Sequence, residues 1–297
     1  MPKNSTPSST SRPGALPGLV SATDLATDRQ FSMNLSRGLD VLRAFTPGEP
    51  VLGNREIVDR TGLPRSTVSR LTYTLLMLGY LARDESSSKY RLAAGVLSLA
   101  HPMLAGLQVR QVARRFMAPL AMRTGCTVNL GMRDRLQVVY IDSCRADSGN
   151  PYLPDIGSTR PLLTSSIGRA LILASPRPAA VAILNRLKVA DPAGFTQSQA
   201  AWARDAKHFA QRGFCLSAGD WRQDMHAVAA PIRQPSRGEC IAMNCTLPVH
   251  RLRSKGELVR MIAPLMLEAV REIESALARP AGIEPATPAF GGQYSIR

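Results

Sequence analysis

Residues Asn54–Leu78, NREIVDRTGLPRSTVSRLTYTLLML, contain the pattern that indicates the fold of the first part of this chain. Asn54 is a candidate N-cap for a short helix and Gly62 its candidate end, because asparagine caps helices and glycine adopts the left-handed conformation that ends them. Pro64 then falls in the first turn of a second helix, which runs to the end of the quoted stretch and stops at Gly79. This order of elements predicts a helix-turn-helix.

The second helix of this stretch has two opposed faces. Its apolar stripe consists of Val68, Leu71, Leu75 and Leu78. The opposite face carries short hydroxyls, an aromatic hydroxyl and an arginine, which suit phosphate positioning and bidentate contact with guanine in the major groove. An ordinary amphipathic surface helix would show the same division, but the ordered turn, helix and following hairpin favour DNA binding. The candidate DNA-binding residues on this helix and hairpin are Arg65, Ser66, Thr67, Ser69, Arg70, Tyr73, Lys89 and Arg91.

Further elements flank this pair of helices. An earlier helical stripe is formed by Leu35, Leu39, Leu42 and Phe45. Residues 80–83 and 89–92 are typical of two short strands around a polar tip, so they predict a wing whose basic side chains hold the DNA backbone. Together these elements predict a winged helix-turn-helix domain over residues 31–92.

The rest of the chain mixes strand and helix patterns, which predicts an α+β fold. A helix containing Val109, Val112, Phe116 and Leu120 comes first. The expected strands are Cys126–Met132, Leu136–Asp142, Ala227–Arg233 and Cys240–Leu247. The expected helices are Thr164–Leu173, Ala179–Leu187, Gln199–Gln211 and Lys255–Ala278. The predicted division is a disordered arm (1–30), the winged domain (31–92), a helical linker (93–107), a second domain (108–279) and a disordered tail (280–297).

The charge of the chain favours a polyanionic partner. It holds 37 Lys plus Arg against 22 Asp plus Glu, a formal net charge of +15, and such an excess points first to nucleic acid. No apolar stretch approaches the roughly 20 residues of a membrane span. The N-terminal residues lack the apolar core of a signal peptide. We therefore expect a cytoplasmic protein that does not contact a membrane.

Several runs of sequence resemble one family of regulators. RGLDVLRAF, REIVDRTGLPRSTVSRLTYTLLMLGYLARD and KYRLAAGVLSL resemble the DNA-binding half of IclR-type bacterial transcriptional regulators. CTVNLGMRDRLQVVYID, DIGSTRPLLTSSIGRALI, RGF and AVAAPI are similar to the sensor half of that family. The resemblance covers roughly residues 33–279. It implies a GAF-like effector-binding domain and a homodimer, or a dimer of dimers, on a palindromic duplex operator, as repressor or activator.

The resemblance also implies where a small-molecule effector would bind. In the family the ligand lies where a helix begins, so free backbone amides can receive a carboxylate. The positions that match the family's contacts are Ser166, Ile167, Ser217, Ala227, Asn244 and Thr246. Ser217, Ala227 and Asn244 stand where the glyoxylate-type pattern has an acidic residue, a cysteine and a serine. TSSIGRA, with Arg169, and AMNCT look closer to members that sense aromatic acids.

Each of these residues has a structural alternative. Ile167 and Ala227 would also suit a hydrophobic core, Arg169 an interface, and His226 either an anionic ligand or a structural position. The five cysteines are Cys126, Cys144, Cys215, Cys240 and Cys245. Their odd number and scattered spacing predict free buried thiols rather than disulfides or zinc.

No enzyme or cofactor motif is present in the sequence. GxSxG, HExxH, a GKS or GKT phosphate loop and GxGxxG are all missing, so we expect no catalysis, cofactor or metal. Two alternatives stay open. One is a GAF-like enzyme that uses Cys126, Cys240 or Cys245. The other is a non-specific nucleic-acid binder, although 5% aromatic residues provide few stacking platforms.

Overall fold

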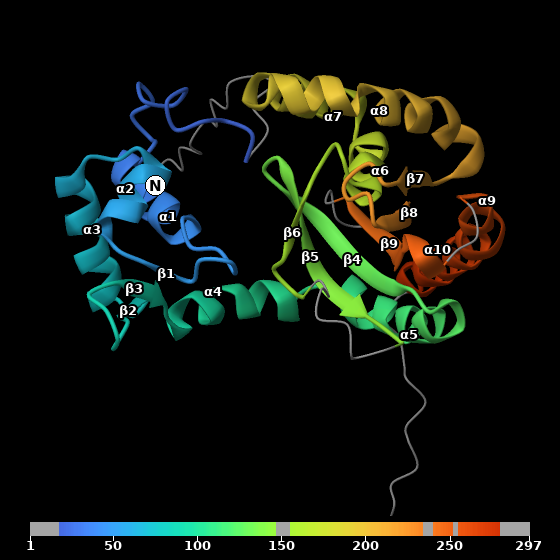
Figure 1. The fold of residues 1–297 in the computed structure, drawn as a ribbon, viewed down its shortest axis with the longest axis horizontal. Coiled ribbons are helices and arrows are strands. Elements are labelled where there is room, and N and C mark those ends of the chain that lie inside the picture. Colours follow the sequence, from blue (N-terminus) through green and yellow to red (C-terminus); the bar gives the residue numbers. More distant parts are fainter. Residues whose placement is uncertain (1–17, 147–154, 234–239, 252–254, 280–297) are drawn as a thin grey trace, which may run out of the picture. The chain divides into compact units, whose positions relative to one another are not determined.

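The computed structural model describes residues 18–146, 155–233, 240–251 and 255–279 (Figure 1). The chain divides into two compact units between Gln108 and Val109, and each unit is described by itself. The first 17 residues of the expected arm and the expected tail lie outside the described residues.

Residues 18–30 are not the structureless arm that the composition predicts. They form consecutive hydrogen-bonded turns, in which the Asp24 N–H donates to the Ser21 carbonyl over 3.1 Å. The Asp24 carboxylate in turn accepts from the Ser21 N–H over 3.0 Å. Short polar side chains therefore close these turns locally, and Leu19 of the same segment is buried.

The first unit combines helices with a three-stranded sheet of order β1-β3-β2. Its elements are α1 (Met33–Arg43), β1 (Val51–Leu52), α2 (Asn54–Thr61), α3 (Arg65–Met77), β2 (Leu81–Arg83), β3 (Tyr90–Leu92) and α4 (Ala94–Ala105). Val41, Ile57, Val68 and Leu81 lie in one buried core that joins α1, α2, α3 and the sheet. The predicted winged helix-turn-helix is confirmed.

The ends of α2 and α3 differ in detail from the predicted ones. Asn54 is the first helical residue of α2, and Gly53 is the N-cap. The Glu56 carboxylate reaches back to accept from the Gly53 N–H over 3.0 Å. Pro64 is the N-cap of α3 rather than a residue of its first turn. Gly62 ends α2 with φ = 66°, the left-handed conformation that glycine adopts at no steric cost.

The buried stripe of α3 also differs from the predicted one. Leu78 is 63% exposed, whereas Thr72 is fully buried. The Thr72 hydroxyl donates to the Val68 carbonyl of its own helix over 3.0 Å and lies 3.3 Å from the Asn54 side-chain oxygen. A satisfied hydroxyl can occupy a core position at little cost, which is why the apolar pattern alone misplaced the stripe.

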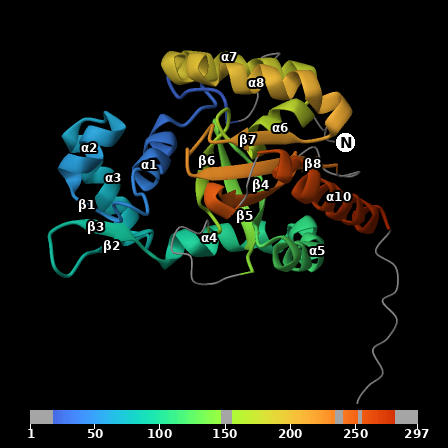
Figure 2. The same ribbon diagram turned by 45° about the vertical axis from the view of Figure 1, so that its right-hand side comes forward.

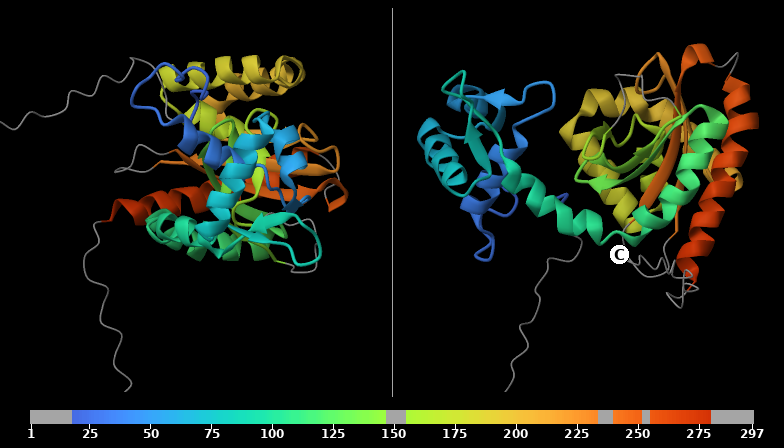
Figure 3. Two further views of the ribbon diagram at one scale, coloured as in Figure 1. Left: turned by 90° about the vertical axis from the view of Figure 1, so that its left-hand side faces the viewer. Right: turned by 90° about the horizontal axis from the view of Figure 1, so that it is seen from below.

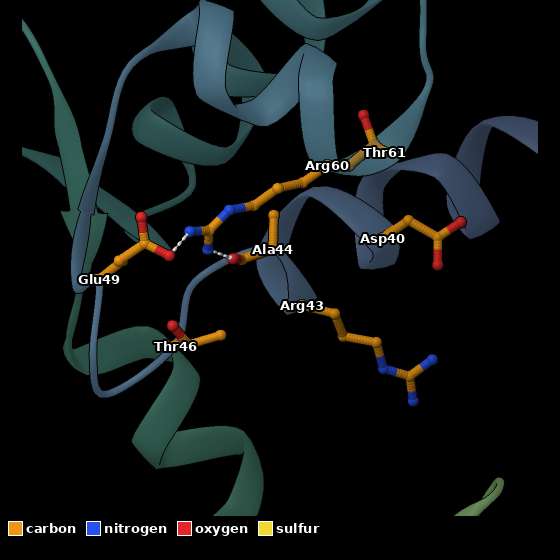
Figure 4. A pocket seen from close by; sticks show the side chains of 7 residues that line it. All are labelled: Asp40, Arg43, Ala44, Thr46, Glu49, Arg60 and Thr61. Carbon is orange, nitrogen blue, oxygen red and sulfur yellow. Dashed lines mark hydrogen bonds and ion pairs between the residues drawn. The ribbon is translucent and has the colours of Figure 1, made fainter. Parts of the chain in front are cut away.

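Arg60 braces α2 against α1. Figure 4 shows its side chain reaching from α2 across Ala44 to Glu49, while the Arg43 guanidinium points away. Arg60 donates to the Ala44 carbonyl over 2.5 Å and forms an ion pair with the Glu49 carboxylate. Because the last carbonyls of a helix have no partner within it, this contact satisfies one at the end of α1.

The second unit is built on a six-stranded antiparallel sheet of order β6-β5-β4-β9-β8-β7. Its strands are β4 (Thr127–Asp134), β5 (Gln137–Cys144), β6 (Thr159–Pro161), β7 (Cys215–Ala218), β8 (Met225–Ile232) and β9 (Ile241–Pro248). Its helices include α5 (Gln108–Thr124), α6 (Ser166–Ala174), α7 (Arg177–Ala190), α8 (Pro192–Arg212) and α10 (Ala263–Ala278). Helices α6, α7 and α8 lie on one side of the sheet and α5 and α10 on the other (Figure 2, Figure 3). The predicted α+β fold is confirmed.

The segment predicted as one helix over residues 255–278 contains an irregularity. After α9 (Lys255–Glu257), residues Leu258–Ile262 form a π-helical turn before α10 begins. Pro264, in the first turn of α10, has no N–H to continue the preceding ladder, so the wider turn precedes it. Among the described residues, no helix is both long and apolar enough to cross a membrane.

Candidate nucleic-acid interface and effector face

The outward face of α3 presents polar groups without acidic neighbours in its first turn. Arg65, Ser66, Ser69 and Tyr73 are exposed on it, and their helical positions place them on one side of the helix. Pro64 precedes the helix with no side-chain cap bond to its first amides. A helix N-terminus of this kind, beside arginine and hydroxyl side chains, can receive a phosphate.

Thr67 and Arg70 lie toward a different neighbour. Both line a hollow of about 580 Å³ between α1 and α3, in which Leu39 and Leu71 also take part. Thr67 is half-buried, whereas Arg70 is exposed at the edge between the hollow and the outward face. The structure therefore brings four of the predicted helix residues together on one face and places Thr67 and Arg70 at or beyond its edge.

The predicted wing residues differ in their environments. Lys89 donates from Nζ to the Glu56 carboxylate of α2 over 2.5 Å, while Arg91 is exposed. The hydrogen bond from Lys89 lowers the pKa of the Glu56 carboxyl below its usual value. The Arg83 guanidinium lies 5.5 Å from the centroid of the Tyr90 ring and covers the base of the wing. Lys89 therefore joins the wing to the helix-turn-helix before any ligand is present.

The predicted effector residues of the sheet lie on one face. Ser217, Ala227 and Thr246 stand directly opposite one another across β7, β8 and β9. Asn244 is two residues from Thr246 along β9, so its side chain shares their face. This is the face that α6 covers, because Ile167 of α6 approaches the Cβ position of Gly131 in β4 to 3.0 Å.

The start of α6 brings the other two predicted residues over that face. The Ser165 hydroxyl caps the helix by accepting from the Gly168 N–H over 3.2 Å. Ser166 and Ile167 follow as its first residues, both buried. Among the described residues, no hydrogen-bond partner lies near the buried hydroxyl oxygens of Ser166 and Thr164. These groups are suited to bind a polar ligand, because a buried hydroxyl without a hydrogen-bond partner raises the free energy of the folded protein.

Gly168 permits the close approach that places this helix start. A Cβ atom there would lie 1.9 Å from the Leu162 carbonyl oxygen. Any side chain would push α6 away from the preceding loop. The glycine of TSSIGRA is therefore required by packing.

Three residues that the sequence patterns did not single out complete this region. Tyr140 is buried in β5, and its hydroxyl accepts from the Asn244 amide over 3.2 Å. Burial raises the pKa of the Tyr140 phenol. The Arg160 guanidinium lies 5.1 Å from the Tyr140 ring centroid and 4.6 Å from that of Trp221. Aromatic rings that stack on the faces of a guanidinium fix its orientation. The N–H groups in its plane then remain able to bind an anion.

Arg169 is a buried structural residue. Its Nε donates to the Asp205 carboxylate over 2.6 Å, and Nη2 donates to Asp220 and to the Leu216 carbonyl, both over 2.9 Å. Nη1 donates to the two carbonyls of residues 163 and 164. The five donors of the guanidinium are thus engaged. Arg169 ties the loop before α6 to α8 and β7, and it has no donor left for a ligand or an interface.

Comparison with known proteins decides the family. Residues 34–85 match the IclR helix-turn-helix domain, and residues 101–275 match the domain described as bacterial transcriptional regulator IclR C-terminal. The chain belongs to the IclR family. As an IclR-family protein it is a DNA-binding transcriptional regulator.

The relatives of this IclR-family chain agree with that assignment. It is 42% identical over 145 residues to the HTH-type transcriptional regulator TsaQ1/TsaQ2 of Comamonas testosteroni, an alignment that spans 48% of this chain and 52% of that one. It is 41% identical to the crystal structure of an IclR family transcriptional regulator from Brucella abortus, with a TM-score of 0.77 and coverage of 84% and 94%. An IclR homolog complexed with 4-hydroxybenzoate, from Microbacterium hydrocarbonoxydans, has the same fold, with a TM-score of 0.64, 22% identity and coverage of 82% and 98%.

Sequence reasoning missed Tyr140, Arg160 and Trp221 for a physical reason. They come from β5, from β6 and from the segment after β7, and Arg160 and Trp221 are 61 residues apart in the numbering. No local spacing links them. The stacking of an arginine between two aromatic rings becomes visible only once the sheet has placed them together.

Proposed function

We propose that this IclR-family regulator binds a duplex operator through α3 and the wing, and that a small aromatic carboxylate in the second unit controls this binding. The exposed face of Arg65, Ser66, Ser69 and Tyr73 would enter the major groove. Arg70 would reach a base from its edge. Thr67 would contact the adjoining backbone, and Lys89 and Arg91 would grip phosphates from the wing.

One observation carries the effector proposal. The predicted contacts Ser217, Ala227, Asn244 and Thr246 share one sheet face, and the start of α6 with Ser166 and Ile167 covers that face. The helix amides and unpartnered hydroxyls suit a carboxylate. The aromatic rings of Tyr140 and Trp221 beside Arg160 suit a planar ring. The homologue complexed with 4-hydroxybenzoate supports this ligand class.

Cysteine catalysis is not favoured by the thiol environments. Cys126 and Cys245 are both buried. The hydrogen bond between them raises the pKa of the Cys245 thiol well above its usual value, with burial adding to this shift, and lowers the pKa of the Cys126 thiol. Burial likewise raises the pKa of the Cys215 thiol. A nucleophilic thiolate needs both a lowered pKa and access to its substrate, and the Cys126 side chain is only 1% exposed.

We propose that the protein acts as a homodimer or a dimer of dimers. The hollow between α1 and α3 is lined by leucines of both helices and by Leu99 of α4. Leu35 is 64% exposed and Leu39 46% exposed beside it. Exposed leucines grouped on one face are typical of an interface with a partner. A second copy that packs on Leu35, Leu39 and Leu99 in an isologous contact, and leaves Thr67 and Arg70 open to DNA, would supply the paired recognition helices that a palindromic operator needs.

The effector proposal is tested by thermal shift with three carboxylates. Benzoate and 4-hydroxybenzoate should raise the melting temperature of the full chain, because binding to the native state adds about 2.7 kcal/mol of stability at a hundredfold excess over Kd. Cyclohexanecarboxylate, which lacks the planar ring, is the matched control and should shift it less. Replacing Arg160 with Ala should reduce the benzoate shift. Equal shifts for all three acids, or none, would contradict the proposed ligand class.

A further inference from the structure

A hydrogen-bonded network of polar side chains begins on the effector face, which is the sheet face that carries Ser217, Ala227, Asn244 and Thr246. Asn244 donates from its amide nitrogen to the Tyr140 hydroxyl over 3.2 Å. Its amide oxygen accepts from the amide of Asn129, on the neighbouring strand β4, over 2.9 Å. The amide oxygen of Asn129 accepts from the Ser143 hydroxyl over 2.8 Å. Asn129 is fully buried and Asn244 nearly so, so the orientation of each amide is fixed by its neighbours.

The network passes from one face of the sheet to the other within β5. Ser143 lies opposite Asn129, and its own backbone N–H donates to the carboxylate of Asp142 over 2.8 Å. Successive residues of a strand point to opposite faces. Ser143 therefore faces the effector side, whereas Asp142 faces α5. Asp142 is 1% exposed.

Two arginines of α5 hold the buried carboxylate. Arg114 donates from Nη1 to the Asp142 oxygen that also accepts from the Ser143 N–H, over 2.9 Å. Arg110, one turn earlier, forms an ion pair with the other oxygen of Asp142, with an N···O distance of 3.5 Å. Since a buried carboxylate requires such partners, Asp142 positions α5 on the sheet. Along the chain, α5 directly follows α4 and the DNA-binding unit.

We propose that the hydrogen-bonded network Asn244–Asn129–Ser143–Asp142 couples occupancy of the effector face to the position of α5, with Asp142 as the positioning residue. A ligand that bonds to Asn244 must compete with Tyr140 or Asn129 for the amide. Because the amides are buried and oriented by one another, a change at Asn244 passes to Ser143 and from there to the carboxylate that holds α5. The regulatory role rests on the proposed function, but the coupling itself is a property of the unliganded protein.

The experiment measures amide hydrogen exchange in the full chain without any ligand. Ser143→Ala removes only the link to Asn129 and keeps the backbone N–H that bonds to Asp142. We expect exchange at residues 108–116 of α5 to accelerate by about fivefold. Ser198→Ala is the matched control. It removes a buried hydroxyl of α8 that donates to the Gly194 carbonyl over 2.7 Å and lies outside the hydrogen-bonded network. It should leave α5 unchanged.

The reciprocal experiment perturbs the other end. Coupling is mutual, so Arg114→Ala should change the NMR chemical shifts of the side-chain amides of Asn129 and Asn244. Arg115→Ala, which removes the neighbouring exposed arginine of α5, should not. The proposal is overturned if Ser143→Ala and Ser198→Ala give the same α5 exchange, or if Arg114→Ala leaves both amide signals in place. Operator binding by the unaltered protein is measured in parallel, so failure of the proposed function would appear there and not in the exchange data.

Discussion

The Nε–H of Arg169 donates to the carboxylate of Asp205 over 2.6 Å, and neither side chain is more than 5% exposed. This pair joins the start of α6, which covers the effector face, to α8. Asp205→Ala takes the carboxylate acceptor from the Arg169 Nε–H and from the Leu216 N–H, and leaves Asp220 as a charged partner of Arg169. It should therefore lower the free energy of unfolding by about 2–4 kcal/mol. Urea denaturation measures this change. Arg204→Ala is the matched control, since Arg204 is 40% exposed and should cost less than about 1 kcal/mol. Equal costs would show that the buried pair does not hold the fold.

Gly168→Ala should destabilise the second unit. The added methyl group would lie 1.9 Å from the Leu162 carbonyl oxygen, so α6 or its preceding loop must shift, at a cost of about 1–3 kcal/mol. Gly48→Ala is the control, because nothing lies within 4 Å of the new Cβ atom there. Thermal melting of both variants measures the difference. A melting temperature for Gly168→Ala equal to that of Gly48→Ala would contradict the packing role of this glycine.

Glu56 should titrate below the usual carboxyl value, because the hydrogen bond from Lys89 lowers its pKa in the folded state. A carboxyl whose pKa is lowered by folding contributes stability above its unfolded pKa and loses it as the pH falls through the folded pKa. The Glu56–Lys89 contact should therefore stabilise the wing at neutral pH and fail in acid. NMR titration of the Glu56 carboxyl measures this, and Lys89→Ala should raise its pKa toward 4.5. An unchanged titration would show that the contact does not form in solution.

Leu39→Glu should dissociate the proposed dimer. A charge on the leucine-lined hollow between α1 and α3 would have to be buried in the interface without a partner. Analytical ultracentrifugation should show the variant as a monomer and the unaltered chain as a dimer or larger. Met122→Glu, an exposed apolar residue of α5, is the control and should keep the assembly. A dimeric Leu39→Glu variant would place the interface elsewhere.

How much the sequence predicts depends on how local the signals are. Gly62 and Pro64 mark the ends of α2 and α3 within a few residues, and β4, β5, β8 and β9 have apolar runs of their own. In contrast, β6 and β7 are short edge strands whose partners lie distant in sequence: Val139 pairs with Thr159, and Cys215 with Ala229. Short strands are defined by their partners more than by their own residues.

The same contrast holds for the candidate sites. The polar residues of α3 can be found on a helical wheel, because their face is set by local periodicity. The hydrogen-bonded network from Asn244 to Asp142 depends on the register of β4 against β5 and β9, including the irregularity between Leu130 and Gly131. A shift of one residue would exchange the faces of these side chains. Such a network can therefore be identified only once the strands are aligned.

We expect α3 and the wing to read a specific duplex sequence. The most direct test compares the affinity of the full chain for a duplex recovered by its binding to genomic fragments with that for a scrambled duplex, at physiological salt. The recovered duplex should bind at least about a thousandfold more tightly than the scrambled one. Arg70→Ala should lose about 1–3 kcal/mol on that duplex alone, while Lys89→Ala should weaken both duplexes alike. Equal affinity of the unaltered protein for the two duplexes would show that α3 and the wing do not read a specific sequence.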